Sequence, residues 1–278
     1  MSSRLILLSF LFVLNLTVFA QQKELPPNLI IYKRIDTTSL KMEVLYPAAL
    51  DKSKHYPCIV FFFGGGWING NINQFRNHAM YLTKRGMVCF LVDYRIKSKH
   101  NTTPFECLKD AKSAIRFIRK NADNLHINKD SIVASGGSAG GHLAAATALI
   151  DGYNESTDDL TISAKPNALV LFNPVIDNGP GGYGFERIGK EYMNFSPLHN
   201  LQKDAPPTIF FLGTKDNLIP VETAQYYKTV MQKIGSRCEL VLYEGEGHGF
   251  FNKKEFLEPT MSKVDEFLRA LNFLKKQQ

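Results

Sequence analysis

The chain has 278 residues, of which 44% are hydrophobic and 21% are charged, and its formal net charge is +7 at pH 7. This composition excludes a disordered or low-complexity chain and is sufficient for a sizeable hydrophobic core. The Lys and Arg residues are scattered rather than gathered in a basic run with interleaved aromatic residues, so we expect no nucleic-acid partner.

The first 20 residues have the layout of a secretory signal peptide. Arg4 supplies a positive charge, the stretch 5–19 is mostly apolar, and Ala20 is a small residue at the expected cleavage point. A membrane anchor is the alternative, but the apolar stretch is short and is interrupted by polar residues. We therefore predict an exported protein, periplasmic or secreted, with no stable membrane anchor and with a single domain over residues 21–278.

Short apolar runs alternate with longer amphipathic segments along the rest of the chain. The apolar runs predict strands at 29–35, 41–46, 58–63, 88–92, 132–135, 168–172, 208–212 and 239–243. The amphipathic segments predict helices at 74–85, 104–121, 139–150, 221–234 and 253–274. This alternation predicts an α/β fold with a mostly parallel eight-stranded sheet flanked by helices. No helix separates the first two strands, so we expect them to pair antiparallel at one edge.

The segment 173–200 fits neither class, because a patch of Asn, Gly and Pro at 178–182 precedes the aromatic residues Tyr183 and Phe185. It follows a strand, where the ligand-facing loops of such sheets lie. The segment is short for a lid domain. We interpret it as a loop that forms one wall of an open cleft.

The four cysteines lie on or beside predicted strands and helices, as buried free thiols usually do. We therefore expect no disulfide among Cys58, Cys89, Cys107 and Cys238. No CxxC motif or Cys/His cluster indicates a metal ion.

The strongest motif is a G-x-S-x-G sequence at residues 136–140, which reads GGSAG. An apolar strand precedes it and a helical run follows it. A strand that turns sharply into a helix holds the serine on a strained elbow, and the helix N-terminus favours negative charge there. A glycine-rich packing turn is the alternative. The context favours Ser138 as a nucleophile.

A serine hydroxyl is a weak nucleophile at neutral pH and needs a base, which is in turn oriented by an acid. In folds of this type the order along the chain is serine, acid, histidine. Asp216 follows the strand at 208–212, and His248 lies in a glycine-rich loop after the last strand. Asp177 is a competing acid, and we prefer Asp216 on chain order.

The other histidines are interpreted as bystanders. His142 is expected to pack on the helix that follows the nucleophile. Surface or loop positions are expected for His55, His78, His100, His126 and His199. Glu246 lies close to His248 in the sequence and receives no role.

Residues 63–67 read FGGGW and follow the third predicted strand. Attack on an ester carbonyl produces a negative oxygen, and backbone N–H groups must already point at it. Glycines permit the close approach and the dihedral angles that such a loop requires. One donor of this kind is worth roughly 3 kcal/mol of transition-state stabilisation. A phosphate-binding loop is the alternative, but no Walker or dinucleotide motif follows.

Four motifs together resemble those of the α/β-hydrolase carboxylesterases: FGGGW at 63–67, DYR at 93–95, GGSAGGHL at 136–143 and GEGHGF at 245–250. Within that family the chain is similar to bacterial esterase/lipase proteins near the hormone-sensitive-lipase-like group and the acetyl-xylan or feruloyl esterase groups. The resemblance runs from about Ile31 to Phe251. It implies the α/β-hydrolase fold with a minimal lid, and neither a cofactor nor a metal ion.

Carried over position by position, the family pattern makes Ser138 the nucleophile, His248 the base and Asp216 the acid that orients it. It assigns the oxyanion hole to three backbone N–H groups, those of Gly65, Gly66 and Ala139.

One position departs from the family pattern, because the family usually has His before the three glycines and this chain has Phe63. In the family that His braces the glycine loop rather than reacts. The change leaves the backbone donors in place and alters the hydrogen bonding of the loop. The DYR sequence at 93–95 matches a structural signature and receives no catalytic role.

These observations predict a secreted serine ester hydrolase that acts on a small-molecule or oligosaccharide ester through an acyl-enzyme. Export and a short lid region favour acetyl or feruloyl esters of polysaccharide fragments, with Trp67, Tyr183 and Phe185 as candidate stacking surfaces. A general short-chain carboxylesterase and a serine peptidase of the prolyl-oligopeptidase type are the alternatives, although the large accessory domain of such peptidases is absent. A non-catalytic binding protein on this fold is a third possibility, but such proteins typically lose the serine or the histidine.

Overall fold

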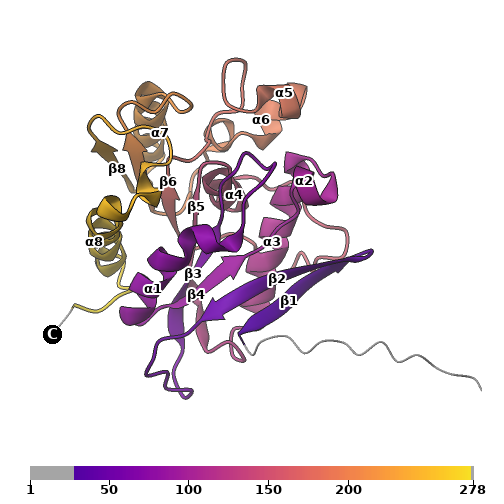
Figure 1. Cartoon of the computed structure of the whole chain (residues 1–278), viewed down its shortest axis with the longest axis vertical. Helices are drawn as coiled ribbons and strands as arrows, with labels where there is room; N and C mark the ends of the chain where they lie inside the picture. The colour runs from indigo at the N-terminus through magenta and orange to yellow at the C-terminus, as the bar shows by residue number, and fades with distance from the viewer. Residues whose placement is uncertain (1–27, 277–278) are drawn as a thin grey trace, which may run out of the picture.

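The computed structural model describes residues 28–276, so the predicted signal peptide lies outside the described residues. Eight strands form one sheet in the order β1-β2-β4-β3-β5-β6-β7-β8 (Figure 1). The strands are β1 Leu29–Ile35, β2 Thr38–Leu45, β3 Tyr56–Phe62, β4 Val88–Val92, β5 Ile127–Gly137, β6 Ala168–Phe172, β7 Thr208–Gly213 and β8 Cys238–Tyr243. β1 pairs antiparallel with β2 and β2 pairs antiparallel with β4, whereas all other pairings are parallel.

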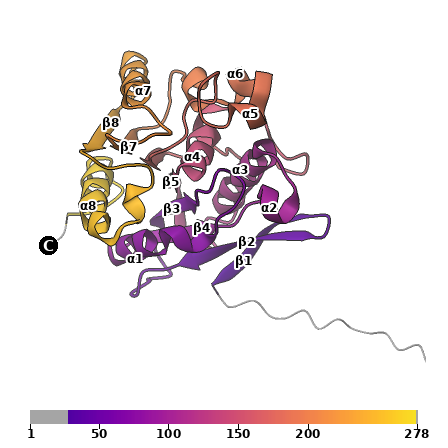
Figure 2. The ribbon, with the colours of Figure 1, turned by 45° about the horizontal axis from the view of Figure 1, so that its top comes forward.

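The central strands are continuous apolar runs because both faces of the sheet are covered. β4 and β6 are buried along their whole length. Helices α1 (Arg76–Lys84) and α8 (Lys254–Ala270) cover one face of the sheet. Helices α3 (Pro104–Lys120), α4 (Ala139–Leu149) and α7 (Val221–Lys233) cover the other, as Figure 2 shows from a second direction. The core therefore consists of two apolar layers, one on each side of the sheet.

The predicted sheet and its antiparallel edge are confirmed, and the differences are local. The short helix α2 (Lys97–His100) was not predicted, because a single turn shows no helical periodicity. The segment 173–200, predicted as a loop, contains α5 (Phe185–Ile188) and α6 (Tyr192–Phe195) together with two 3₁₀ turns. These turns lie above the sheet in Figure 1, beside α4.

The buried cysteines and histidines complete the interior. All four cysteines are buried and free, as predicted. His142 is buried on α4, also as predicted, but His78 is not a surface residue. His78 lies on the inner side of α1 among the rings of Phe75, Phe172 and Phe251. Among residues 28–276, no helix is both long and apolar enough to cross a bilayer.

Candidate active site

Ser138 stands on the turn between β5 and α4. Its backbone has φ 53° and ψ −121°, a strained combination for a residue with a side chain. The turn is possible because its neighbours are glycines. A Cβ atom on Gly140 would overlap the carbonyl oxygen of Phe62, and one on Gly137 would overlap the ring of Phe251. The strand–helix elbow predicted from the sequence is therefore present, and close packing explains its glycines.

The structure brings Ser138, His248 and Asp216 together in a continuous hydrogen-bonded line. His248 Nε2 lies 2.9 Å from Ser138 Oγ, and His248 Nδ1 lies 2.8 Å from Asp216 Oδ2. An ionised carboxylate accepts only, so Nδ1 carries a proton that it donates to Asp216. Nε2 is then free to accept the serine proton. This is the arrangement that general-base activation of a serine hydroxyl requires.

Asp216 is held in place by hydrogen bonds from the backbone as well as by its contact with His248. Its second oxygen, Oδ1, accepts the backbone N–H groups of Leu218 at 2.9 Å and Ile219 at 3.0 Å. Its side chain is fully buried. These contacts hold the carboxylate in one orientation and supply the hydrogen bonds that water cannot provide at this buried position.

The competing acid lies elsewhere in the structure. Asp177 accepts the N–H of Gly179 at 2.8 Å and is 3.9 Å from His199 rather than near His248. Glu246 forms an ion pair with Lys253 at 2.6 Å. Neither carboxylate contacts the line of Ser138, His248 and Asp216.

The glycine loop after β3 offers donors beside the nucleophile. The N–H of Gly64 is occupied, because it donates to Gln74 Oε1 at 2.6 Å. Gly65 and Gly66 have φ of 126° and 65°, which residues with a side chain rarely adopt. Within residues 28–276 the N–H groups of Gly65, Gly66 and Ala139 donate to no protein acceptor. These are the three groups predicted to form the oxyanion hole.

Three side chains hold the glycine loop in place of the missing family histidine. Gln74 binds Gly64, as described above. The Tyr94 hydroxyl donates to the carbonyl of Phe63 at 2.6 Å, and the two rings stack with centroids 4.2 Å apart. Arg187 Nη1 donates to the carbonyl of Gly66 at 2.5 Å. Phe63 therefore braces the loop by packing, and the hydrogen bonds come from other elements.

Of the three aromatic residues predicted to offer stacking surfaces, Trp67 does not. Its side chain is 1% exposed and packs edge-on against His142, so the prediction of a surface role is wrong. Its φ of 60° turns the chain inward after the glycines, and Gly184 and Tyr183 pack against the ring. Tyr183 and Phe185 are partly exposed, and the Tyr183 hydroxyl lies over Gly66.

Several residues that touch the site belong to none of the motifs from which the site is predicted. Asn173 contacts His248, and Gln74, Tyr94 and Arg187 hold the glycine loop. Only Asn173 carried a usable signal, because it follows β6 directly at the carboxyl edge of the sheet, where ligand sites of such folds lie.

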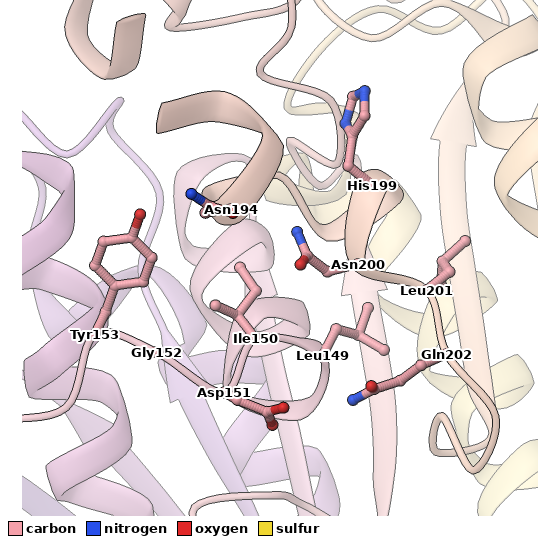
Figure 3. Close-up of a pocket in the computed structure, with 10 residues that line it drawn as sticks. All are labelled: Leu149, Ile150, Asp151, Gly152, Tyr153, Asn194, His199, Asn200, Leu201 and Gln202. Atoms are coloured by element: carbon pink, nitrogen blue, oxygen red, sulfur yellow. The ribbon is translucent and has the colours of Figure 1, made fainter. Parts of the chain in front are cut away.

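A separate polar cavity of about 610 Å³ lies between the end of α4 and the segment 194–202 (Figure 3). Its lining includes Asp151, Tyr153, Asn194 and Gln202. The cavity is lined neither by the hydrogen-bonded residues Ser138, His248 and Asp216 nor by the glycine loop, so it is not the reaction centre. In the part of the chain that the structure describes, no group of His, Cys, Asp and Glu side chains could hold a metal ion.

Two protein families match the chain. Residues 42–180 match the BD-FAE family, and residues 179–278 match the Dienelactone hydrolase family. Among curated proteins, Esterase LipC of Mycobacterium tuberculosis is 28% identical over 71% of this chain and 54% of its own length. The Acetylxylan esterase of Xylanibacter ruminicola is 28% identical over 67% of this chain and 39% of its own length. The chain thus spans about half or less of these two relatives.

One solved structure is similar to this chain over nearly the whole length of both. The apo form of Thermogutta terrifontis esterase 2 has 42% sequence identity and a TM-score of 0.86, covering 90% of this chain and 97% of that one. Other structures of the same esterase have propionate or butyrate bound, and one is phosphorylated by paraoxon. Together the two family matches span residues 42–278, which contain every residue of the site described above.

Proposed function

Since this chain belongs to the α/β-hydrolase esterases, we propose that it is a serine carboxylesterase that cleaves short-chain acyl esters through an acyl-enzyme. The observation that carries the proposal is the hydrogen-bonded line from Asp216 through His248 to Ser138. The glycine loop and the elbow add three backbone N–H groups, those of Gly65, Gly66 and Ala139, which donate to no acceptor within residues 28–276 and can stabilise an oxyanion.

The proposed steps follow the general mechanism of a serine, histidine and aspartate that act together. Nε2 of His248 accepts the Ser138 proton as Oγ attacks the ester carbonyl, and Asp216 stabilises the imidazolium that forms. The N–H groups of Gly65, Gly66 and Ala139 stabilise the negative oxygen. Nε2 then donates its proton to the departing alcohol. Water attacks the acyl-serine with His248 again as base, which releases the acid and restores the enzyme.

The substrate proposal has two levels: the first is the length of the acyl group, and the second is the carbohydrate that carries it. The propionate and butyrate bound to the Thermogutta esterase support a short acyl group for this chain too. The similarity to an acetylxylan esterase and the match to the BD-FAE family support an acetylated or feruloylated carbohydrate as the substrate. We propose the deacetylation of polysaccharide fragments outside the cytoplasm, where the predicted signal peptide would deliver the protein.

A series of 4-nitrophenyl esters from acetate to decanoate tests the first level, with Ser138→Ala as the inactive control. We expect kcat/KM to be highest for the acetate to butyrate members and turnover by Ser138→Ala to be undetectable. Near-wild-type turnover by this variant would disprove the assignment of the nucleophile.

Acetate release from acetylated xylo-oligosaccharides, measured beside methyl ferulate and dipeptide amides, tests the second level. Faster turnover of the acetylated oligosaccharide than of a simple alkyl acetate supports carbohydrate specificity. Equal rates identify a general short-chain esterase, and cleavage of the amides identifies a peptidase.

A further inference from the structure

Asn173 is a buried polar residue next to the catalytic histidine. It is the first residue after β6, its side chain is fully buried, and its backbone N–H donates to the carbonyl of Phe211 at 2.7 Å. Its φ is 33°, in the left-handed region that Asn tolerates better than most residues. The backbone is therefore held in an unusual conformation that aims the amide at the reaction centre.

The contacts of the Asn173 side chain define which end of the amide faces His248. The backbone N–H of Gly249 is a donor and lies 3.2 Å from Asn173 Oδ1. The carbonyl end of the amide must face this donor, which orients the group independently of the histidine. The amino end, Nδ2, then points at His248 Nε2 at a distance of 3.3 Å.

Nε2 is the atom that gains and loses the proton in the proposed reaction. In the resting enzyme Nδ1–H faces Asp216, so Nε2 accepts from both Ser138 Oγ and Asn173 Nδ2. Once Nε2 is protonated it becomes a donor, and an amide N–H cannot accept from it. The Asn173 contact therefore exists only with the neutral imidazole. The Gly249 contact ties the same residue to the loop that carries His248.

We propose that Asn173 is a positioning residue that holds the neutral imidazole of His248 in line with Ser138. The contact with Nε2 is lost when the imidazolium forms, which favours return of the proton to the leaving alcohol. This inference rests on the proposed esterase function for its kinetic consequence, whereas its effect on the histidine is independent of any substrate.

The test compares two variants, Asn173→Asp and Asn173→Ala. Asn173→Asp keeps an acceptor for Gly249 and replaces the donor facing Nε2 with a carboxylate oxygen. The other charged groups around His248 are Asp216 at Nδ1, Lys215, which precedes Asp216 in the sequence, and Glu246, which lies two residues before His248 and is paired with Lys253. All of these are unchanged in the variants.

For Asn173→Asp we expect the acid limb of the kcat/KM profile to move to higher pH by about one unit or more, because the carboxylate stabilises the imidazolium. For Asn173→Ala we expect kcat for 4-nitrophenyl acetate to fall at least tenfold, with KM changed less than threefold. An acid limb in Asn173→Asp that coincides with that of the wild type would overturn the proposal. So would a kcat in Asn173→Ala within twofold of the wild type.

A titration of ¹⁵N-labelled histidine by NMR, without substrate, separates this inference from the proposed function. We expect the His248 midpoint to move to higher pH in Asn173→Asp even if no ester is turned over. An unchanged midpoint in a variant whose thermal unfolding shows that it is folded contradicts the role of Asn173. An enzyme that cleaves no ester but shows the shift contradicts only the esterase.

Discussion

At the scale of single residues, the two candidate acids differ in what they touch. Asp216 contacts the ring of His248, whereas Asp177 contacts the N–H of Gly179 and lies near His199. Replacing Asp216 with Asn removes the charge that stabilises the imidazolium and allows the wrong tautomer. We expect kcat to fall by roughly 10⁴. Steady-state kinetics with 4-nitrophenyl acetate measures the loss.

Asp177→Asn is the matched control, because an Asn side chain can still accept the N–H of Gly179. We expect this variant to keep kcat within twofold of the wild type. If Asp177→Asn suffered the large loss and Asp216→Asn did not, the two residues would have to exchange roles.

A second residue-scale feature is the hydrogen bond from the Gly64 N–H to Gln74 Oε1, which holds the glycine loop where the family histidine is absent. Gln74→Ala leaves the Gly64 N–H unpaired and loosens the loop. We expect kcat to fall about fivefold, because a lost hydrogen bond is worth about 1 kcal/mol and catalysis depends on the position of the loop. Exposed Gln225 on α7 provides the control variant Gln225→Ala. Equal kcat values for the two variants would show that the packing of Phe63 and Tyr94 suffices.

At the scale of elements, the elbow depends on close contact between α4 and β3. A Cβ atom on Gly140 would overlap the backbone of Phe62 and Phe63, which cannot move without disturbing the sheet. We expect Gly140→Ala to lower the free energy of unfolding by about 3 kcal/mol, the upper part of the range for overpacking. Urea unfolding measures the change as a lower midpoint.

Gly152 is the control for this substitution, because a Cβ atom there meets no neighbouring atom and its φ is ordinary. We expect Gly152→Ala to be neutral within about 0.5 kcal/mol. A Gly140→Ala protein as stable as this control would mean that β3 and α4 can separate at low cost.

The elements that sequence patterns predict best are those whose signal is local. β1, β4 and β6 have the predicted bounds, because β4 and β6 are apolar runs and β1 begins as one and ends at a turn. β5 begins at Ile127 rather than at the predicted residue 132, because residues 128–131 are polar and Ile127 belongs to the strand through its pairing with Tyr56. Pairing partners in the sheet are not visible in a single sequence.

The site too combines features with a local sequence signal and features that depend on tertiary contacts. The reactive groups follow from a short motif and from chain order, which are both properties of the sequence. The supports of the glycine loop could not be predicted, because Gln74, Tyr94 and Arg187 reach their partners only through the tertiary fold. The burial of Trp67 has the same origin, since its inward turn depends on Gly184 and Tyr183 packing over the ring.

At the scale of the whole molecule, two histidines are locked inside the apolar layers, one on each face of the sheet. Burial lowers the pKa of His78 to about 4, and burial likewise lowers the pKa of His142 to about 4 against the opposing effect of its hydrogen bonds. In the unfolded chain each would titrate near the ordinary value of 6.5. Between these two values the unfolded state binds more protons than the folded state.

The free energy of unfolding should therefore be at its full value above pH 6.5 and should fall as the pH drops toward 4. The difference between a pKa of 6.5 in the unfolded chain and about 4 in the folded protein corresponds to at most about 3 kcal/mol of unfolding free energy for each histidine. His78→Leu removes one of the two groups, and an apolar side chain suits its aromatic surroundings. We expect this variant to lose about half of the acid destabilisation.

Urea unfolding at pH 7.0, 5.5 and 4.5 measures this effect, and the partly exposed His55 provides the control variant His55→Leu. The control should follow the pH dependence of the wild type, because an accessible imidazole can be protonated without unfolding. If His78→Leu retained the full wild-type fall in stability, the acid sensitivity would originate in the carboxylates that pair with Lys and Arg. His78 would then have to gain its proton inside the folded core at little cost, in conflict with its packing against three phenylalanine rings.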